Sequence, residues 1–292
     1  MGAHPRPISE EQWSAILDRE GHEPCPGVLL QTGIEIPGAE DGPAQTAVLY
    51  TPEEPVARPM PAVLAFHGGG YCMGDPFGMG AFAKAMALAL GVATFSASYR
   101  LGTEASPTGP AIVRDAVSAW NHVRSRASDY GIAPERIAVA GESAGCLLAG
   151  HLAVGSPLVR GAEGRPIALY SFWGPLDFVA RWYDNGQSPG AEVNIFGPGG
   201  FPAHPALYHW VSPLTHASDG PLPPALLVYG STDAVVHPRQ AALAAAAWRE
   251  ARSHAEEFVV PNIGHGVEGD NRGQRRRVLE RAIAFGATRH VG

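Results

Sequence analysis

The sequence has few cysteines, no excess of basic charge and no long hydrophobic run. Its three cysteines are an odd number without short spacings, which argues against a disulfide framework and against a cysteine-based metal or redox site. The formal net charge of −7 argues against sequence-independent binding to nucleic acid, which needs a basic surface. The most apolar stretch, residues 83–95, is interrupted and too short to span a bilayer. We therefore expect a cytoplasmic protein with no nucleic-acid or membrane partner and no bound metal.

The composition is that of a folded protein with a substantial core. Of the 292 residues, 45% are hydrophobic and 17% are charged, which argues against a disordered chain. The 27 prolines and 36 glycines are spread along the chain and do not form a linker. We therefore expect a single domain over residues 1–292.

Apolar runs and helical stripes alternate along most of the chain. The predicted N-terminal helix, residues 9–20, begins with a capping box made by Ser9 and Gln12. Two strands that form an antiparallel hairpin and a buried strand follow, and after them helices and strands alternate to the end of the chain. The predicted strands are 27–38, 46–52, 62–70, 92–100, 136–142, 166–174, 224–230 and 256–262. The predicted helices are 82–91, 110–131, 144–155, 238–252 and 275–290. This order predicts the α/β class, with a doubly wound, mostly parallel sheet and helices on both faces.

One long segment, residues 176–222, breaks the alternation. It is too long for a structureless loop in a compact domain, so we expect it to form a lid or small cap.

The pattern Gly-x-Ser-x-Gly, typical of a nucleophilic serine, occurs twice, at residues 141–145 and 186–190. Ser143 stands between a buried strand and a helix, and its flanking glycines permit the strained turn that exposes such a serine. Ser188 has no strand before it, and Pro189 lacks the N–H that an oxyanion hole needs there. We therefore predict Ser143 as the nucleophile and interpret the second match as a loop.

A serine needs a base, and in hydrolases with such a sheet the acid and the histidine follow the serine along the chain. Asp233 comes directly after the strand at 224–230, and His265 after the strand at 256–262. The alternatives are a helix cap for Asp233 and a solvent-exposed turn for His265. Asp219 and Glu268 are the reserve candidates for the acid.

Three consecutive glycines, at residues 68–70, follow the first buried strand. Glycines let backbone N–H groups open toward a ligand, which is how an oxyanion hole forms without side chains. A flexible hinge is the alternative interpretation. We predict Gly69, Gly70 and Ala144 as the oxyanion donors.

In chain order, the segments HGGGYCMGD, SYRL, GESAG, STD and GHG resemble those of the hormone-sensitive-lipase-like esterases of the α/β-hydrolase superfamily, over about residues 45–290. The resemblance implies an α/β-hydrolase fold and hydrolysis of carboxylic esters, usually with short acyl groups, without a cofactor. It also implies Ser143, Asp233 and His265 as the triad.

Some positions depart from that family. Cys146 and Leu147 stand where it commonly has Gly and Asn, and the usual Ala-Pro-Glu after the Tyr-Arg-Leu at 99–101 is absent. The later region also resembles small esterases related to feruloyl esterases.

The substrate is expected to lie against the aromatic side chains of the predicted lid. We predict Tyr71, Trp173, Phe178 and Trp182 as substrate contacts. The whole aromatic group is Phe172, Trp173, Phe178, Trp182, Tyr183, Phe196, Phe201, Tyr208 and Trp210, and packing of the lid onto the domain is the alternative role for about half of it. Arg181 and Arg239 are candidate contacts for a carboxylate.

The function predicted is a serine esterase that acts on a small-molecule ester, and activity is expected to fall at acid pH as His265 is protonated. A homodimer is compatible with this prediction. Amidases or formamidases, peptidases, lactonases and acyltransferases share the serine turn and remain alternatives. A binding protein that kept the cavity and lost catalysis is the alternative from another class.

Overall fold

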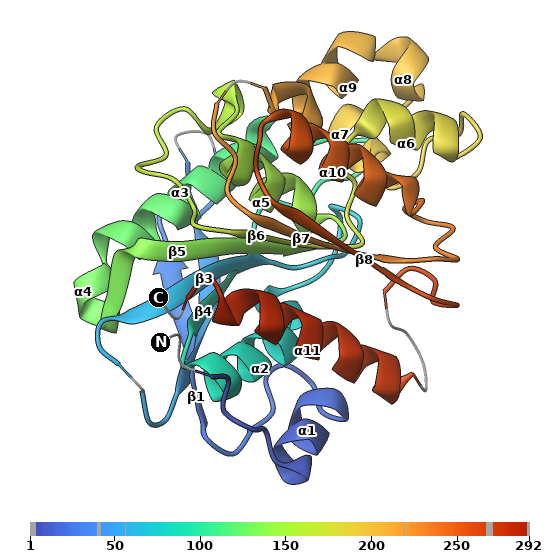
Figure 1. Ribbon diagram of the computed structural model, residues 1–292. Coiled ribbons are helices and arrows are strands. Elements are labelled where there is room, and N and C mark those ends of the chain that lie inside the picture. The colour runs from blue at the N-terminus through green and yellow to red at the C-terminus, as the bar shows by residue number, and fades with distance from the viewer. Residues whose placement is uncertain (1–3, 40–41, 56, 219, 267–270, 291–292) are drawn as a thin grey trace.

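The computed structural model describes residues 4–39, 42–55, 57–218, 220–266 and 271–290. One eight-stranded sheet, in the order β1-β2-β4-β3-β5-β6-β7-β8, forms its centre (Figure 1). The strands β1 and β2 are antiparallel to their neighbours, and all later pairs are parallel. The strands are β1 (Val28–Ile36), β2 (Gln45–Pro52), β3 (Met60–Phe66), β4 (Ala93–Ala97), β5 (Ile132–Glu142), β6 (Leu169–Phe172), β7 (Ala225–Gly230) and β8 (Ala255–Val260). The predicted fold class is confirmed, including the hairpin.

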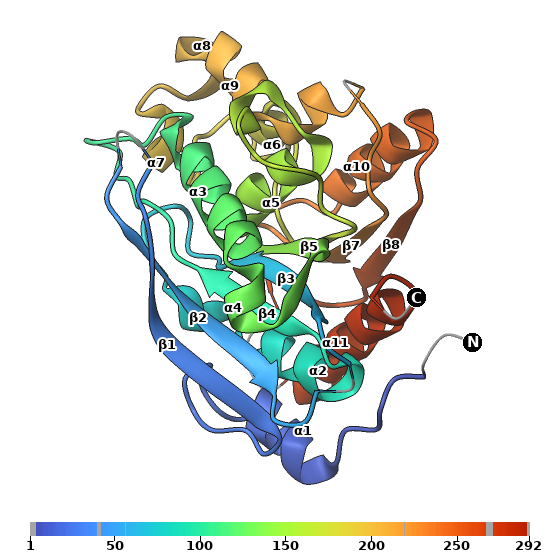
Figure 2. The same cartoon turned by 90° about the vertical axis from the view of Figure 1, so that its left-hand side faces the viewer.

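Long helices cover both faces of this sheet. The helices α3 (Ala111–Ser125), α5 (Gly145–Val154) and α10 (Arg239–Glu250) lie on one face, while α2 (Gly80–Leu90) and α11 (Arg272–Ala287) lie on the other (Figures 1 and 2). Each face has its own cluster of buried apolar side chains. All seven residues of β3 are buried, as expected for a strand covered on both sides.

Local sequence signals explain where several helices begin and end. The helix α1 (Glu10–Leu17) begins at Ser9, whose side chain accepts from the N–H of Gln12 in a capping box. Gly91, in the left-handed region, ends α2. The helix expected over residues 110–131 is interrupted: α3 ends at Ser125, and a short helix, α4 (Ala127–Tyr130), follows.

The described residues within 176–222 form four short helices and a 3-10 turn. These are α6 (Phe178–Asp184), α7 (Val193–Phe196), α8 (Gly200–Ala203), α9 (Pro205–Val211) and η3 (Pro213–His216). They lie beyond the sheet on the side of α3, α5 and α10 (Figure 1). The remaining 3-10 turns are η1 (Pro76–Met79) and η2 (Pro157–Val159). Within the described ranges, none of the helices is long and apolar enough to cross a membrane.

Candidate active site

Ser143 occupies a sharp turn between β5 and α5. Its φ of 48° lies in the left-handed region, which is unusual for a residue other than glycine. The turn is crowded: a Cβ added at Gly145 would lie 2.1 Å from the carbonyl oxygen of Phe66, and one at Gly141 would lie 2.5 Å from the nitrogen of Cys146. Both flanking glycines are therefore needed for this geometry, as the sequence pattern predicted.

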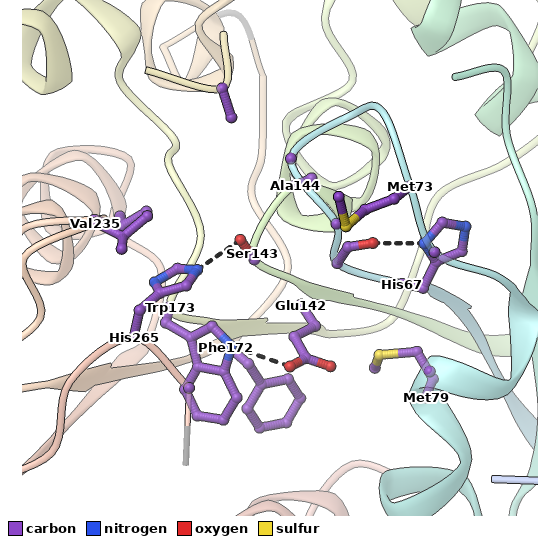
Figure 3. Close-up of a pocket in the computed structure, with 18 of the residues that line it drawn as sticks. His67, Met73, Met79, Glu142, Ser143, Ala144, Phe172, Trp173, Val235 and His265 are labelled. Carbon is purple, nitrogen blue, oxygen red and sulfur yellow. Dashed lines mark hydrogen bonds between the residues drawn. The ribbon is translucent and has the colours of Figure 1, made fainter. Parts of the chain in front are cut away.

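Three side chains form a continuous hydrogen-bonded chain that begins at this serine. Ser143 Oγ lies 2.8 Å from His265 Nε2 (Figure 3). His265 Nδ1 lies 2.8 Å from Asp233 Oδ2. The N–H groups of Val235 and Val236 donate to the other carboxylate oxygen of Asp233, both at 2.8 Å. The carboxylate at Nδ1 favours the tautomer with its proton there, so Nε2 is free to accept the serine proton.

The second serine candidate from the sequence lies elsewhere. Ser188 is exposed in the connection between α6 and α7 and does not follow a strand. The reserve acids, Asp219 and Glu268, lie outside the described residues. Of the predicted catalytic residues, the structure brings together Ser143, Asp233 and His265.

The glycine loop after β3 lies beside Ser143. Gly69 has φ 118° and Gly70 has φ 57°. A Cβ at Gly69 would lie 2.1 Å from the carbonyl oxygen of Met73, so only glycine fits there. In the described part of the chain, the N–H groups of Gly69, Gly70 and Ala144 make no backbone hydrogen bond. Together with the N-terminus of α5 at Ala144, they can receive negative charge at Ser143.

These groups share a cavity of about 790 Å³. On one face of the sheet it reaches the segment from α6 to α7, and on the other it reaches η1, α2 and α11. The lining includes residues 67–75, Gly78, Met79, Ala81, Phe82, residues 142–144, Phe172, Trp173, Pro175, Arg181, Ala191, Val235, Val236, His265, Gly266, Arg275, Val278 and Leu279. We call the part formed by Met79, Ala81, Phe82, Glu142, Phe172, Trp173, Arg275, Val278 and Leu279 the inner branch.

The cavity lining includes two of the four expected substrate contacts. Tyr71 and Trp173 line the cavity, but Phe178 and Trp182 are not among its described lining residues. Phe178 is fully buried and packs its ring edge-on against Phe196, at a centroid distance of 5.3 Å. Trp182 packs edge-on against Tyr208.

The other aromatic side chains of the predicted lid behave similarly. The ring of Tyr208 contacts the rings of Phe196 and Phe201. Apart from Phe172 and Trp173, none of that group is among the described residues that line the cavity. Packing of the segment onto the domain, the alternative role considered from sequence, therefore accounts for most of these rings.

Sequence reasoning did not identify Glu142 as a site residue. Its carboxyl group accepts a hydrogen bond from Trp173 Nε1 at 3.2 Å. Burial raises the pKa of this carboxyl, while the hydrogen bond from Trp173 and the nearby His265 and Arg275 oppose that increase. The signal in the sequence that could have identified Glu142 is its position directly before the nucleophilic serine.

The two candidate carboxylate contacts differ in position. Arg181 lines the cavity and is 5% exposed, and its Nε lies 3.1 Å from Glu192 Oε2. Arg239 pairs with Asp184 at the surface and is not among the described lining residues. Only Arg181 is therefore placed to contact a ligand.

No group of three or more described histidine, cysteine or acidic side chains is arranged to hold a metal ion. Of the cysteines, Cys25 and Cys146 are buried and Cys72 is exposed, and none is in a disulfide. The Sγ of Cys146 lies 3.0 Å from the carbonyl oxygen of Gly141, and burial raises the pKa of this thiol to about 12. Cys146 is therefore an inert part of the core beneath the serine turn.

Comparison with known proteins finds a matching family model and several relatives of this chain. A family model described as the alpha/beta hydrolase fold matches residues 63–268. The chain is 35% identical over 134 residues to the esterase LipI of Mycobacterium tuberculosis, a match that covers 46% of this chain and 40% of the relative. It is 29% identical over 184 residues to the carboxylesterase NlhH of the same species, covering 61% of this chain and 54% of that one.

The likeness in three dimensions extends over almost the whole chain. A solved structure described as a bacterial heroin esterase has a TM-score of 0.74 and 24% identity, covering 95% of this chain and 87% of that one. This match supports the fold alone. The two mycobacterial matches span only about half of the relatives' length, 40% and 54%.

Proposed function

Since this chain belongs to the alpha/beta hydrolase fold family, in its hormone-sensitive-lipase-like branch, we propose that it hydrolyses carboxylic esters through an acyl-serine intermediate. The observation that carries the proposal is the hydrogen-bonded chain from Ser143 through His265 to Asp233, inside a cavity large enough for a small ester. The names of the mycobacterial relatives, an esterase and a carboxylesterase, support the same activity.

In the proposed mechanism, Ser143 Oγ attacks the ester carbonyl while His265 Nε2 takes its proton. Asp233 holds the imidazole in the required tautomer and stabilises the imidazolium that forms. The N–H groups of Gly69, Gly70 and Ala144 receive the oxyanion, and the loss of one such donor typically costs on the order of 10²–10³ in rate. The alcohol leaves with the proton from His265, and a water molecule activated by His265 then releases the acid.

We also propose that residues 176–222 act as a cap over the cavity, on the face of the sheet opposite the inner branch. The whole chain is proposed to form a single domain. Arg181 and Ala191 from this segment line the cavity. The aromatic rings within the segment stabilise it as a packed unit. A small-molecule ester is the proposed substrate, while a homodimer and a cytoplasmic location remain expectations from the sequence.

A fluorophosphonate probe tests the proposal without knowledge of the natural ester, because it labels only an activated serine. Intact mass is measured for the wild type and for Ser143→Ala, His265→Ala and Ser188→Ala. We expect one adduct that is lost in Ser143→Ala, strongly reduced in His265→Ala and retained in Ser188→Ala. A folded wild-type protein that takes no adduct would overturn the proposal.

Product analysis separates the proposed esterase from enzymes with the same serine turn. An ester, an amide, a lactone and an ester with an added acceptor alcohol are compared at equal concentration. We expect hydrolysis of the ester to dominate, with little transfer to the alcohol. Dominant cleavage of the amide or lactone, or dominant transfer, would replace the esterase proposal by the corresponding activity.

A further inference from the structure

The inner branch of the cavity is apolar except for a small number of charged groups. Met79 and Phe82 contribute apolar side chains from η1 and α2, and Val278 and Leu279 do so from α11. The charged groups are the carboxyl of Glu142 and the guanidinium of Arg275, with Asp75 lining the cavity at the start of η1. Asp75 lies outside the branch as defined, so the charged groups within it are one carboxyl and one guanidinium.

Only one oxygen of Glu142 has a partner among the described residues. Oε1 accepts from the indole N–H of Trp173, and no hydrogen bond to the other oxygen is found in the described part of the chain. The side chain points away from the Ser143 hydroxyl, into the space between Trp173 and Met79 (Figure 3). This oxygen lines the cavity without a donor from the described residues, so a ligand that enters the branch can supply one.

One nitrogen of the Arg275 guanidinium is hydrogen-bonded outside the branch, while its charge still acts on Glu142. Its Nη1 donates to the carbonyl oxygen of Leu17, the last residue of α1, at 2.8 Å. Asp75 is also partly engaged, because its carboxylate accepts from the N–H of Phe77. Of the charged groups named here, Glu142 therefore has a carboxylate oxygen that is available as a hydrogen-bond acceptor, and it directly precedes Ser143 in the sequence.

We propose that the inner branch is a subsite for a short alkylammonium group carried by the ester, and that Glu142 is the residue that selects it. The alkyl chain packs against Met79, Phe82 and Leu279, while the ammonium donates to the free oxygen of Glu142. This inference rests on the proposed function, because it places the subsite beside the serine that attacks the ester. A neutral alkyl group of equal length satisfies the apolar wall but leaves the carboxyl without a donor.

The test compares inhibitors that differ only in the terminal group. Hexylammonium and hexanol, and the corresponding butyl pair, are measured as competitive inhibitors of p-nitrophenyl acetate hydrolysis at pH 8. We expect each ammonium ion to bind about tenfold more tightly than its alcohol, a ratio that corresponds to about 1.4 kcal/mol. In Glu142→Gln the ratio should fall to about one.

A matched control is Glu135→Gln, on the same strand but exposed at the surface, where the ratio should stay as in the wild type. The ratio reports specificity whatever the variant does to the overall rate, so a merely structural role of Glu142 would leave it unchanged. Equal inhibition by ammonium and alcohol in the wild type, or a ratio that survives in Glu142→Gln, would overturn the proposal.

Calorimetry distinguishes failure of the subsite from failure of the proposed function. Binding of hexylammonium is titrated into Ser143→Ala and into the double variant Ser143→Ala, Glu142→Gln. Binding by the first and weaker binding by the second would support the subsite even if no ester were hydrolysed. Equal heats in the two proteins would reject the subsite even if the wild type were an active esterase.

Discussion

Asn194 donates a hydrogen bond from its side-chain Nδ2 to the carbonyl oxygen of Gly70, at 2.9 Å. Asn194 belongs to α7, in the segment proposed as a cap, and Gly70 belongs to the glycine loop beside the nucleophile. The carbonyl oxygen of Asn194 also accepts from the N–H of Thr108, which fixes its backbone. A segment more than one hundred residues away in the chain therefore holds the loop that carries the proposed oxyanion donors.

Asn194→Ala should lower kcat by about tenfold with a smaller change in KM, because the oxyanion donors act mainly in the transition state. Steady-state kinetics with p-nitrophenyl acetate measure both constants. Ser188→Ala, in the same segment but exposed, serves as the control and should leave both unchanged. A rise in KM alone for Asn194→Ala would show that its contact with Gly70 serves substrate binding.

Asp233→Asn should lower kcat by about 10²–10⁴-fold while the protein remains folded. The amide oxygen can keep the hydrogen bonds from Val235 and Val236, but its NH₂ group would face His265 Nδ1 and favour the wrong tautomer. The rate is measured beside the urea midpoint of unfolding. If Asp233 is only a helix cap, the rate will stay near that of the wild type.

Gly145→Ala should destabilise the protein by about 1–3 kcal/mol and abolish labelling of Ser143 by the fluorophosphonate probe. The added methyl group would lie 2.1 Å from the carbonyl oxygen of Phe66, and neither backbone can move away without deforming the turn. Gly273→Ala is the control, because a Cβ there meets no atom within 4 Å at the start of α11. Similar labelling of both variants would argue against a strained turn at Ser143.

The free energy of unfolding should decrease as the pH falls from about 6.5 toward 3. Burial lowers the pKa of His151 and of His290 from 6.5 to about 3, so between these values the unfolded chain binds more protons than the folded one. Each histidine then contributes a loss of up to about 1.4 kcal/mol per pH unit. Above pH 6.5 both are neutral in either state, and this contribution vanishes.

Urea unfolding of the wild type and of His151→Gln at pH 7.0, 5.5 and 4.5 measures the histidine contribution. The glutamine can keep a hydrogen bond to the carbonyl oxygen of Val211, which His151 Nε2 contacts at 3.0 Å. The variant should lose less stability between pH 7.0 and 4.5 than the wild type. An identical loss in both proteins would exclude His151 as a source of the acid sensitivity.

The sequence by itself determined the fold class and the positions of the turn residues. Backbone geometry at Ser143 and at Gly69 depends on neighbours within a few residues, so a strand followed by Gly-x-Ser-x-Gly or by three glycines predicts it. The chain order of serine, acid and histidine placed Asp233 and His265 at the ends of adjacent parallel strands, and the structure joins them by hydrogen bonds.

Only the tertiary structure decided which side chains form the walls of the cavity. Val278 and Leu279 are buried in their helix, but helical periodicity does not say that they line the same cavity as Ser143. In the same way, Phe178 and Trp182 are aromatic in the right segment, yet they pack onto other rings of that segment. Local turn chemistry is encoded within a few residues, whereas the partner of an apolar face depends on how distant elements pack, and a single sequence does not specify that pairing.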